Sequence, residues 1–282
     1  MKELIECFLK LYKYYVIKVL WLVAFIGITM LIFTVLRLCT QPVAMSDSMT
    51  DSLQCIDAPH LQRVDYTGFR VYFNPEWHIP ACVIYELTID ESHGRLPRSN
   101  EWVSDHKVNG CPEPEVYSGS GYDRGHMVPA GDLKWSEEAM AQSFTMTNVC
   151  PQNHSLNEGA WGDLEEKIRE WVQHDSALIV IAGPIVLDTD TITLKPSRRK
   201  AQKGVRPIVP SAFYKIVLAH RAQPMRAIAF IYPNKPSYGK FESYTTTIEE
   251  IERLTQLNFF SCLKPDEAAR LKSSRSPRLW LR

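Results

Sequence analysis

Residues 122–126 read YDRGH, residues 147–152 read TNVCPQ, and residues 156–165 read LNEGAWGDLE. This stretch places a histidine, an arginine, several amide side chains and carboxylates among glycines. Hydrolysis of a phosphodiester needs a base that deprotonates water and positive charge that stabilises the extra negative charge on phosphorus. A histidine suits the first task at neutral pH, and a hard divalent cation or an arginine suits the second. The residue types in 122–165 therefore permit phosphodiester chemistry.

The spacing within 157–165 restricts how these residues act together. Asn157, Trp161 and Glu165 are separated by four residues each, so on a helix they share one face, apart from the apolar stripe that begins at Leu164. Asn157 and Glu165 would be about 12 Å apart along the axis, so both reach one ion only if the first turn is irregular. The spacing favours an amide ligand with a carboxylate that acts through water.

Each of these residues also has a structural explanation. His126 follows a glycine and can be a structural residue of a turn, Asn157 can cap the helix that begins at Glu158, and Arg124 can pair with Asp123 at the surface. Spacing alone does not choose between these explanations and catalysis.

The three motifs together resemble the DNA/RNA non-specific endonuclease family, which includes mitochondrial endonuclease G and secreted bacterial nucleases. The similar segments are Asp-Arg-Gly-His at 123–126, Asn-x-x-Pro-Gln at 148–152 and Leu-Asn-x-Gly-x-Trp-x-x-Leu-Glu at 156–165. Arg98 ahead of Trp102, and segments 209–215, 229–234 and 247–260, also fit the family, so the resemblance covers about 63–263. It implies a ββα-metal core within an α+β fold.

The resemblance implies a role for three residues in catalysis. His126 resembles the general base, and Asn157 resembles the single direct protein ligand of Mg²⁺, for which Mn²⁺ can substitute. Glu165 resembles the acid that holds metal-bound water and helps protonate the leaving group. The reaction implied is attack of water on DNA or RNA, which leaves 5′-phosphate ends.

The resemblance also implies phosphate-binding residues. Arg124 and Arg98 resemble the arginines that bind the substrate and stabilise the charge of the transition state, although Arg95 lies close enough to Arg98 to compete for this role. Asn148 resembles a supporting residue near the site and is assigned to substrate binding. Asp123 is expected to orient the motif strand rather than to take part in the chemistry.

Composition and charge limit the classes of protein that fit. Of 282 residues, 45% are apolar and 23% are charged, which is typical of a chain that folds around a core. The formal net charge is zero, and residues 39–263 carry 21 Lys/Arg against 28 Asp/Glu. A strongly basic nucleic-acid-binding domain is thereby excluded, and phosphate contacts must come from local clusters such as the one between Lys195 and Arg206.

The N-terminal region contains one long apolar segment. Residues 19–36 carry no charge, which is about the length that crosses a bilayer. We expect a cytoplasmic N-terminus (1–15), a transmembrane anchor (16–38), a linker (39–62), the nuclease domain (63–263) and a basic flexible tail (264–282). Four lysines precede the segment, so the positive-inside rule predicts a membrane-anchored protein whose catalytic domain is exported to the periplasmic or extracellular side.

The domain itself shows alternating β-rich and helical patterns. We expect strands at 68–73, 82–88, 177–182, 212–219 and 226–232, and helices at 136–143, 157–174 and 247–257. The expected fold is a central antiparallel sheet flanked by helices, with one strand presenting His126 and the next helix presenting Asn157. Five of the seven cysteines lie between Cys55 and Cys262, beyond the apolar segment, and disulfides and free buried thiols are equally compatible with their spacing.

The expected function is that of a Mg²⁺-dependent, sugar-non-specific endonuclease. One rival is a membrane-tethered nucleic-acid-binding protein with an inactive site, and another is a phosphodiesterase that acts on small nucleotides. Intact His126, Asn157 and Glu165 argue against the first rival. Cleavage of linear dinucleotides would favour the second.

Overall fold

The computed structural model describes residues 12, 14–18, 21, 25–30, 56–190, 192–195, 204–237 and 239–280. The chain divides into two units, Met1–Met49 and Thr50–Arg282, of which the second contains the folded domain. Most of the basic cluster between Lys195 and Arg206 lies outside the described residues.

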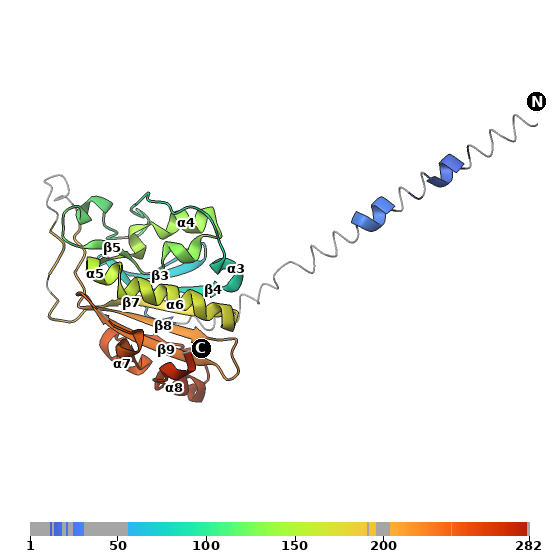
Figure 1. Ribbon diagram of the computed structural model, residues 1–282. Coiled ribbons are helices and arrows are strands. Elements are labelled where there is room, and N and C mark those ends of the chain that lie inside the picture. Colours follow the sequence, from blue (N-terminus) through green and yellow to red (C-terminus); the bar gives the residue numbers. More distant parts are fainter. Residues whose placement is uncertain are drawn as a thin grey trace, which may run out of the picture. The chain divides into compact units, whose positions relative to one another are not determined.

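A seven-stranded antiparallel sheet forms the centre of the domain (Figure 1), in the order β10-β9-β8-β7-β4-β3-β2. Its strands are β2 (Gln62–Tyr66), β3 (Phe69–Asn74), β4 (Ile79–Thr88), β7 (Ala177–Ile185), β8 (Ala212–Ala219), β9 (Arg226–Pro233) and β10 (Thr245–Thr246). The longest strands are almost continuously apolar because helices cover both faces of the sheet.

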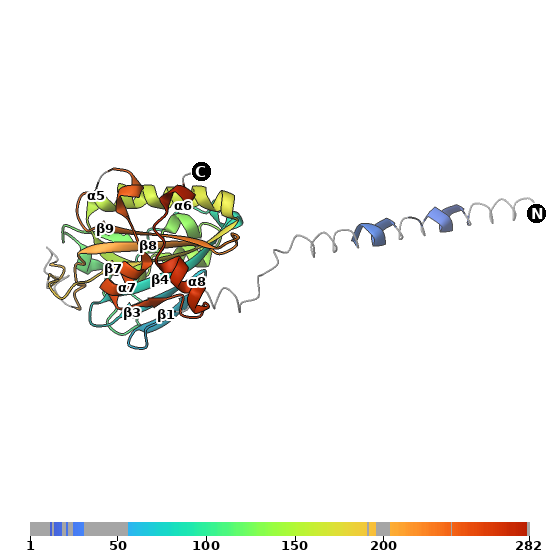
Figure 2. The same cartoon turned by 90° about the horizontal axis from the view of Figure 1, so that it is seen from below.

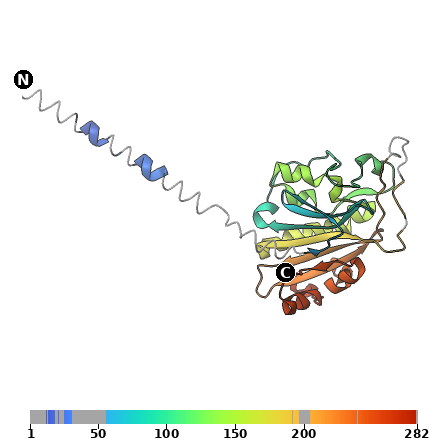
Figure 3. The same ribbon diagram turned by 180° about the vertical axis from the view of Figure 1, so that it is seen from behind.

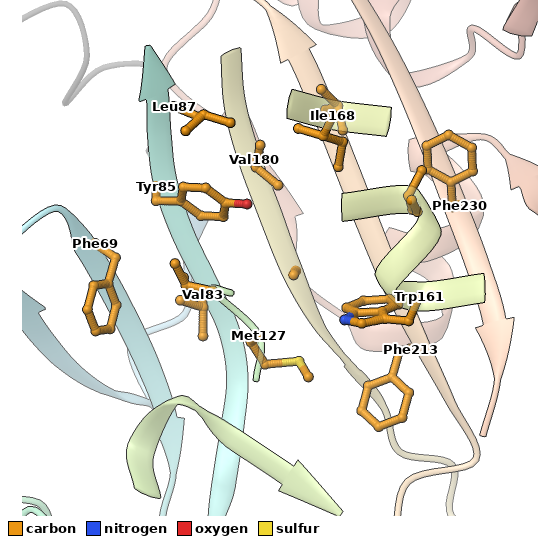
Figure 4. Packing of buried hydrophobic residues seen from close by; sticks show 14 of the residues in the cluster. Phe69, Val83, Tyr85, Leu87, Met127, Trp161, Ile168, Val180, Phe213 and Phe230 are labelled. Atoms are coloured by element: carbon orange, nitrogen blue, oxygen red, sulfur yellow. The ribbon is translucent and has the colours of Figure 1, made fainter. Parts of the chain in front are cut away.

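One face of the sheet is covered by α6 (Ala160–Asp175), and the opposite face by α7 (Ile248–Thr255) and α8 (Pro265–Lys272). Figure 2 shows these two layers on either side of the strands. Strand residues alternate between the layers, since each side chain points opposite to its neighbours. Figure 4 shows the α6 layer, where Trp161 meets Phe213 and Met127 reaches in from the motif segment.

The remaining elements are short. They are β1 (Ile56–Asp57), which pairs with β11 (Asn258–Phe259), α3 (Ile89–Ser92), α4 (Glu137–Ser143), α5 (His154–Asn157), β5 (Asp123–His126), β6 (Val149–Gln152) and the 3-10 turns η1 (Pro114–Tyr117), η2 (Ala130–Leu133), η3 (Met146–Asn148), η5 (Phe241–Tyr244) and η6 (Pro277–Trp280). Figure 3 shows the green segment with α4 across the sheet from α7 and α8. The motif segment therefore packs on the α6 side of the sheet.

The predicted transmembrane anchor over 16–38 is wrong. Among the residues that the structure describes, no helix is both long and apolar enough to cross a membrane. Part of 16–38 lies outside the described residues.

The C-terminal segment differs from the expected flexible tail. It contains α8 and η6, and Trp280 is buried with its ring centroid 4.9 Å from that of Trp171. Arg226 lies over the same ring at 4.9 Å. The many basic residues of 264–282 gave no sign of this aromatic contact, which joins Trp280 to the α6 layer.

Both alternatives that the sequence left open for the cysteines, a disulfide and a free thiol, occur in the structure. Cys262 is disulfide-bonded. Cys82, Cys111 and Cys150 have free thiols, and Cys82 and Cys150 are fully buried.

Candidate active site

Strands β5 and β6 form a separate two-stranded ladder that carries the Asp-Arg-Gly-His motif. Gly125 lies opposite Cys150, and His126 lies opposite Val149. A side chain at Gly125 would collide with the side chain of Gln152, so the close approach of the two strands requires glycine here. The motif glycine thus permits the pairing that places His126 at the end of β5.

His126 is enclosed between two aromatic rings, those of Trp102 and Phe144, which we call the aromatic cage. Each ring centroid lies 4.9 Å from that of the imidazole. The residue is 8% exposed, and its Nε2 is buried without a hydrogen-bond partner. Burial, with the positive charge of Arg98 as a second cause, lowers the pKa of His126 to about 3. The ring is therefore uncharged at neutral pH, which is the form that a base must have.

This depressed pKa predicts how the stability of the fold changes with pH. Below its ordinary pKa of 6.5, His126 takes up a proton in the unfolded chain but not in the folded one, until the pH approaches about 3. It therefore lowers stability as the pH falls through this window, by at most about 1.4 kcal/mol per pH unit. We expect His126→Asn to flatten the urea-unfolding free energy between about pH 4 and pH 7, relative to wild type. Parallel curves for the two proteins would contradict the burial of an uncharged ring.

The two arginines share the aromatic cage with His126. The guanidinium of Arg98 lies 5.1 Å from the Phe144 ring centroid, and that of Arg124 lies 5.4 Å from the Trp102 ring centroid. Arg124 Nη2 donates to the carbonyl of Pro114 at 2.8 Å, while its Nε is buried without a partner. Arg98 is exposed and Arg124 is half-buried. The structure thus brings two cations to the rings that enclose the imidazole.

Asn148 lies behind His126 and is fully buried. Its Oδ1 accepts the backbone N–H of Val128 at 2.9 Å, and its Nδ2 donates to the carbonyls of Val128 and Ser143. Its own carbonyl accepts the N–H of Met127 at 2.9 Å. These bonds fix the chain immediately after His126, and they use both the oxygen and the nitrogen of the Asn148 side chain.

Asn157 is attached to the motif strand through Asp123. Its Nδ2 donates to Asp123 Oδ2 at 2.9 Å, and the same oxygen is 2.9 Å from Nδ1 of the exposed His154. This arrangement fits the expected role of Asp123 as an orienting residue. It also commits the amide nitrogen of Asn157 and leaves its oxygen without a hydrogen bond among the described residues.

This donor set fits one kind of metal ion. The described residues contain no group of three or more His, Cys, Asp or Glu side chains that could hold a metal. A site built on the Asn157 amide oxygen instead fits a hard cation that keeps most of its water ligands, as Mg²⁺ does. Zn²⁺, which takes three or four protein ligands, does not fit.

The chain between Asn157 and Glu165 is not one continuous helix. α5 ends at Asn157, and α6 begins at Ala160 after a glycine cap. A side chain at Gly159 would lie 2.6 Å from the carbonyl oxygen of Ser155, so glycine permits this tight junction. The axial separation of about 12 Å that a straight helix gives therefore does not apply. Trp161 is 1% exposed and belongs to the core, although its spacing predicted a face apart from the apolar stripe.

Glu165 lies on α6 with its side chain 14% exposed. Its Oε1 accepts a hydrogen bond from Lys215 Nζ at 3.1 Å. Burial raises the pKa of Glu165, against the opposing effect of the Lys215 charge. The structure therefore holds this carboxylate through a buried ion pair.

Three residues of this arrangement were not predicted as site residues. Phe144 has no local signal in the sequence, and Trp102 was used only as part of the resemblance. Asn234 ties α5 in place, because its Oδ1 accepts the Asn153 N–H at 2.8 Å while its Nδ2 donates to the carbonyls of Pro151 and Pro210.

Comparison with known protein sequences finds similarity to nucleases. The sequence profile described as DNA/RNA non-specific endonuclease matches residues 57–266. The mitochondrial nuclease EXOG of Xenopus laevis is 35% identical over 218 residues, which are 72% of this chain and 59% of that protein. Its human counterpart is 34% identical over 222 residues, covering 69% and 56%. The chain thus spans less than two thirds of the length of these relatives.

A solved structure described as the EndoG/EndoGI complex is similar in fold. Its TM-score is 0.63 at 22% identity, and the match covers 73% of this chain and 88% of that chain. At this identity the similarity concerns the fold alone. In sequence, human mitochondrial endonuclease G is 32% identical over 147 residues, which are 51% of this chain and 50% of that protein.

The predicted localisation, a membrane-anchored protein with an exported catalytic domain, is wrong. The part of the chain that the structure describes contains no helix able to span a membrane. The relatives named above, and a further one from Schizosaccharomyces pombe, are described as mitochondrial nucleases. The predicted membrane partner has no support for the same reasons.

Proposed function

The chain belongs to the DNA/RNA non-specific endonuclease family, and from this we propose that it is a Mg²⁺-dependent endonuclease that hydrolyses both DNA and RNA. The observation that carries the proposal is the uncharged, caged imidazole of His126 beside two arginines. A base, cations for the phosphate and an amide oxygen for a metal all lie on or beside the β5–β6–α5 unit.

In the proposed reaction His126 accepts a proton from the attacking water. The aromatic cage holds the ring in one orientation, which reduces the entropy lost when water and base align. The positive charge of Arg98 is one cause of the low His126 pKa. A bound phosphodiester anion near Arg98 would offset that charge, so substrate binding makes the imidazole a stronger base.

Arg124 and Arg98 stabilise the negative charge that develops on phosphorus. Arg124 is held by the Pro114 carbonyl, and its unpartnered Nε is a donor without a protein acceptor. A fixed guanidinium can bind two phosphate oxygens with little reorganisation. Glu165 is proposed to accept a hydrogen bond from a water molecule that in turn gives a proton to the leaving oxygen, which yields a 5′-phosphate end.

Asn157 is the residue that would hold the metal ion. When bound, Mg²⁺ supplies positive charge to the phosphate and to the leaving oxygen. The hydrogen bond from Asn157 Nδ2 to Asp123 turns the amide so that its oxygen is available. Asp123 thereby orients the Asn157 side chain without itself binding the metal ion.

The proposed site addresses the phosphate, which DNA and RNA share, and phosphate contacts carry no base information. We therefore expect cleavage of double-stranded DNA, single-stranded DNA and RNA with little sequence preference. Because residues 39–263 are net acidic by count, binding should rest on few contacts and weaken as salt rises.

The test is digestion of a plasmid, a single-stranded circle and a structured RNA, with and without Mg²⁺, at low and high salt. Full activity in excess chelator would reject the metal, and discrete bands at one sequence would reject the lack of specificity. Retention of the three substrates on a filter without cleavage would favour the inactive binding protein. Cleavage of dinucleotides alone would favour the phosphodiesterase.

A further inference from the structure

Strand β8 carries a charged residue in a core position. Lys215 falls in the row of side chains that faces α6, and its side chain has no solvent exposure. The other members of that row are apolar, namely Phe213, Val217 and Ala219. Charged residues are almost never fully buried unless they are paired. The position of Lys215 therefore requires a partner within the core.

The partners of Lys215 lie one turn apart on α6. Its Nζ is 3.1 Å from Glu165 Oε1 and 3.9 Å from the ring centroid of Trp161. Trp161 is itself fixed by the rings of Phe213 and Tyr232, at 5.7 and 6.2 Å between centroids. Lys215 Nζ thus contacts both the Glu165 carboxylate and the Trp161 ring, without exposure to solvent.

A second ion pair, in which the carboxylate of Asp132 is fully buried and Arg169 is partly exposed, lies next to the first. Asp132 accepts hydrogen bonds from Tyr85 Oη and Arg169 Nη1, both at 2.7 Å. Figure 4 shows Tyr85 and Trp161 in the same layer between the sheet and α6. Asp132 already has Arg169 as its counterion, so Lys215 is the cation that balances Glu165.

The charged and titratable groups around Glu165 come from four elements. They are Lys215 on β8, Asp132 on η2, Arg169 on α6 and Tyr85 on β4. Burial raises the pKa of Glu165, the charge of Asp132 adds to this effect, and Lys215 and Arg169 oppose it. Without Lys215, the buried carboxylate would lose its nearest positive charge.

We infer that Lys215 is a positioning residue of the active site, whose buried ammonium fixes the orientation of Glu165 and balances its charge. The inference rests on the proposed function, because it concerns the part that Glu165 plays there. Lys215 itself is enclosed and does not touch the substrate. Its effect on the reaction must therefore pass through Glu165.

The test is a double-mutant cycle of Lys215→Met and Glu165→Gln, assayed on plasmid DNA with Mg²⁺. We expect Lys215→Met to lower kcat about 100-fold, the loss that a misplaced reacting group can cause, with KM for DNA little changed. Because Lys215 acts through Glu165, the double variant should cleave at the rate of Glu165→Gln alone. Lys167→Met is the matched control, since Lys167 pairs with Glu170 near the surface of the same helix.

A loss of folding in Lys215→Met would not prevent the test. That variant leaves Glu165 buried without its counterion, which is destabilising. The double variant removes both charges, and proteins often keep their stability when both members of a buried ion pair are replaced. The comparison between the double variant and Glu165→Gln then decides, with melting temperatures as the check on folding.

Each outcome has a separate meaning. Absence of cleavage by the wild-type protein would reject the proposed function. If the wild type cleaves, a Lys215→Met variant with unchanged kcat would overturn the inference alone. A double variant far slower than Glu165→Gln would also overturn it, because Lys215 would then act independently of Glu165.

Discussion

Replacement of His126 by alanine should leave a folded protein whose nuclease activity is about 10²–10⁴-fold lower than that of the wild type. This is the loss expected when a positioned general base is removed. The caged ring is uncharged at neutral pH and lies beside both arginines. The measurement is the initial rate of plasmid cleavage, with near-ultraviolet circular dichroism to show that the aromatic cage persists.

Two other histidines complete this experiment, one as a control and one as the rival base. His106 is exposed and lies 3.8 Å from Glu113, so His106→Ala should keep wild-type activity. His154 is the rival base, because it is exposed and contacts Asp123, the residue that orients Asn157. Near-wild-type cleavage by His126→Ala together with loss in His154→Ala would transfer the role of base to His154.

The central strands of the fold could be predicted because their signal is local. The expected strand 212–219 coincides with β8, and the expected strand 226–232 falls within β9. Their apolar runs end at turns, and helices cover both faces. The edge strand β2 was missed because its sequence, QRVDY, is polar and half exposed. Edge strands have less apolar surface to bury, so composition reveals them less clearly.

The break between α5 and α6 depends on backbone packing that a periodic pattern does not encode. The repeat of Leu164, Ile168 and Trp171 extends smoothly back toward Asn157, which suggests one helix. The structure instead inserts Glu158 and Gly159 between two helices. The glycine was visible in the sequence, but its meaning depends on its close approach to Ser155.

The candidate site was predicted through its motif residues, whereas the residues that enclose them were not. The aromatic cage joins Trp102, His126 and Phe144 through contacts between segments remote in sequence. No local pattern specifies such contacts. Lys215 is different, because a single charge within the apolar strand AFYKIVLA was already a sign of a buried partner.

The N-terminal apolar segment gave a strong local signal, but the prediction drawn from it was wrong. Eighteen uncharged residues satisfy the length criterion for a span. That criterion assumes a continuous helix, and the described residues contain no helix of that length and apolarity. The predicted exported location depended on the anchor and is wrong with it.

The second large effect is expected at Asn157. Asn157→Ala removes the amide oxygen that we propose as the direct metal ligand, together with the hydrogen bond to Asp123. Loss of an outer-sphere partner alone costs about 10–100-fold in metal affinity or activity, so loss of the ligand should cost at least about 100-fold. Asn258→Ala is the matched control, because Asn258 lies on β11, where it accepts a hydrogen bond from Lys272 at 2.8 Å.

The measurement is the Mg²⁺ dependence of plasmid cleavage, since a lost ligand and a lost base respond differently to added metal. Asn157→Ala should regain part of its activity as Mg²⁺ is raised, because water can replace one ligand of an ion that already keeps several. His126→Ala should show the same half-saturating Mg²⁺ as the wild type at a lower maximal rate. Asp123→Asn should resemble Asn157→Ala, since Asp123 turns the amide toward the ion. A wild-type Mg²⁺ dependence in Asn157→Ala would show that the metal is held elsewhere, and Glu165 would then be the next residue to test.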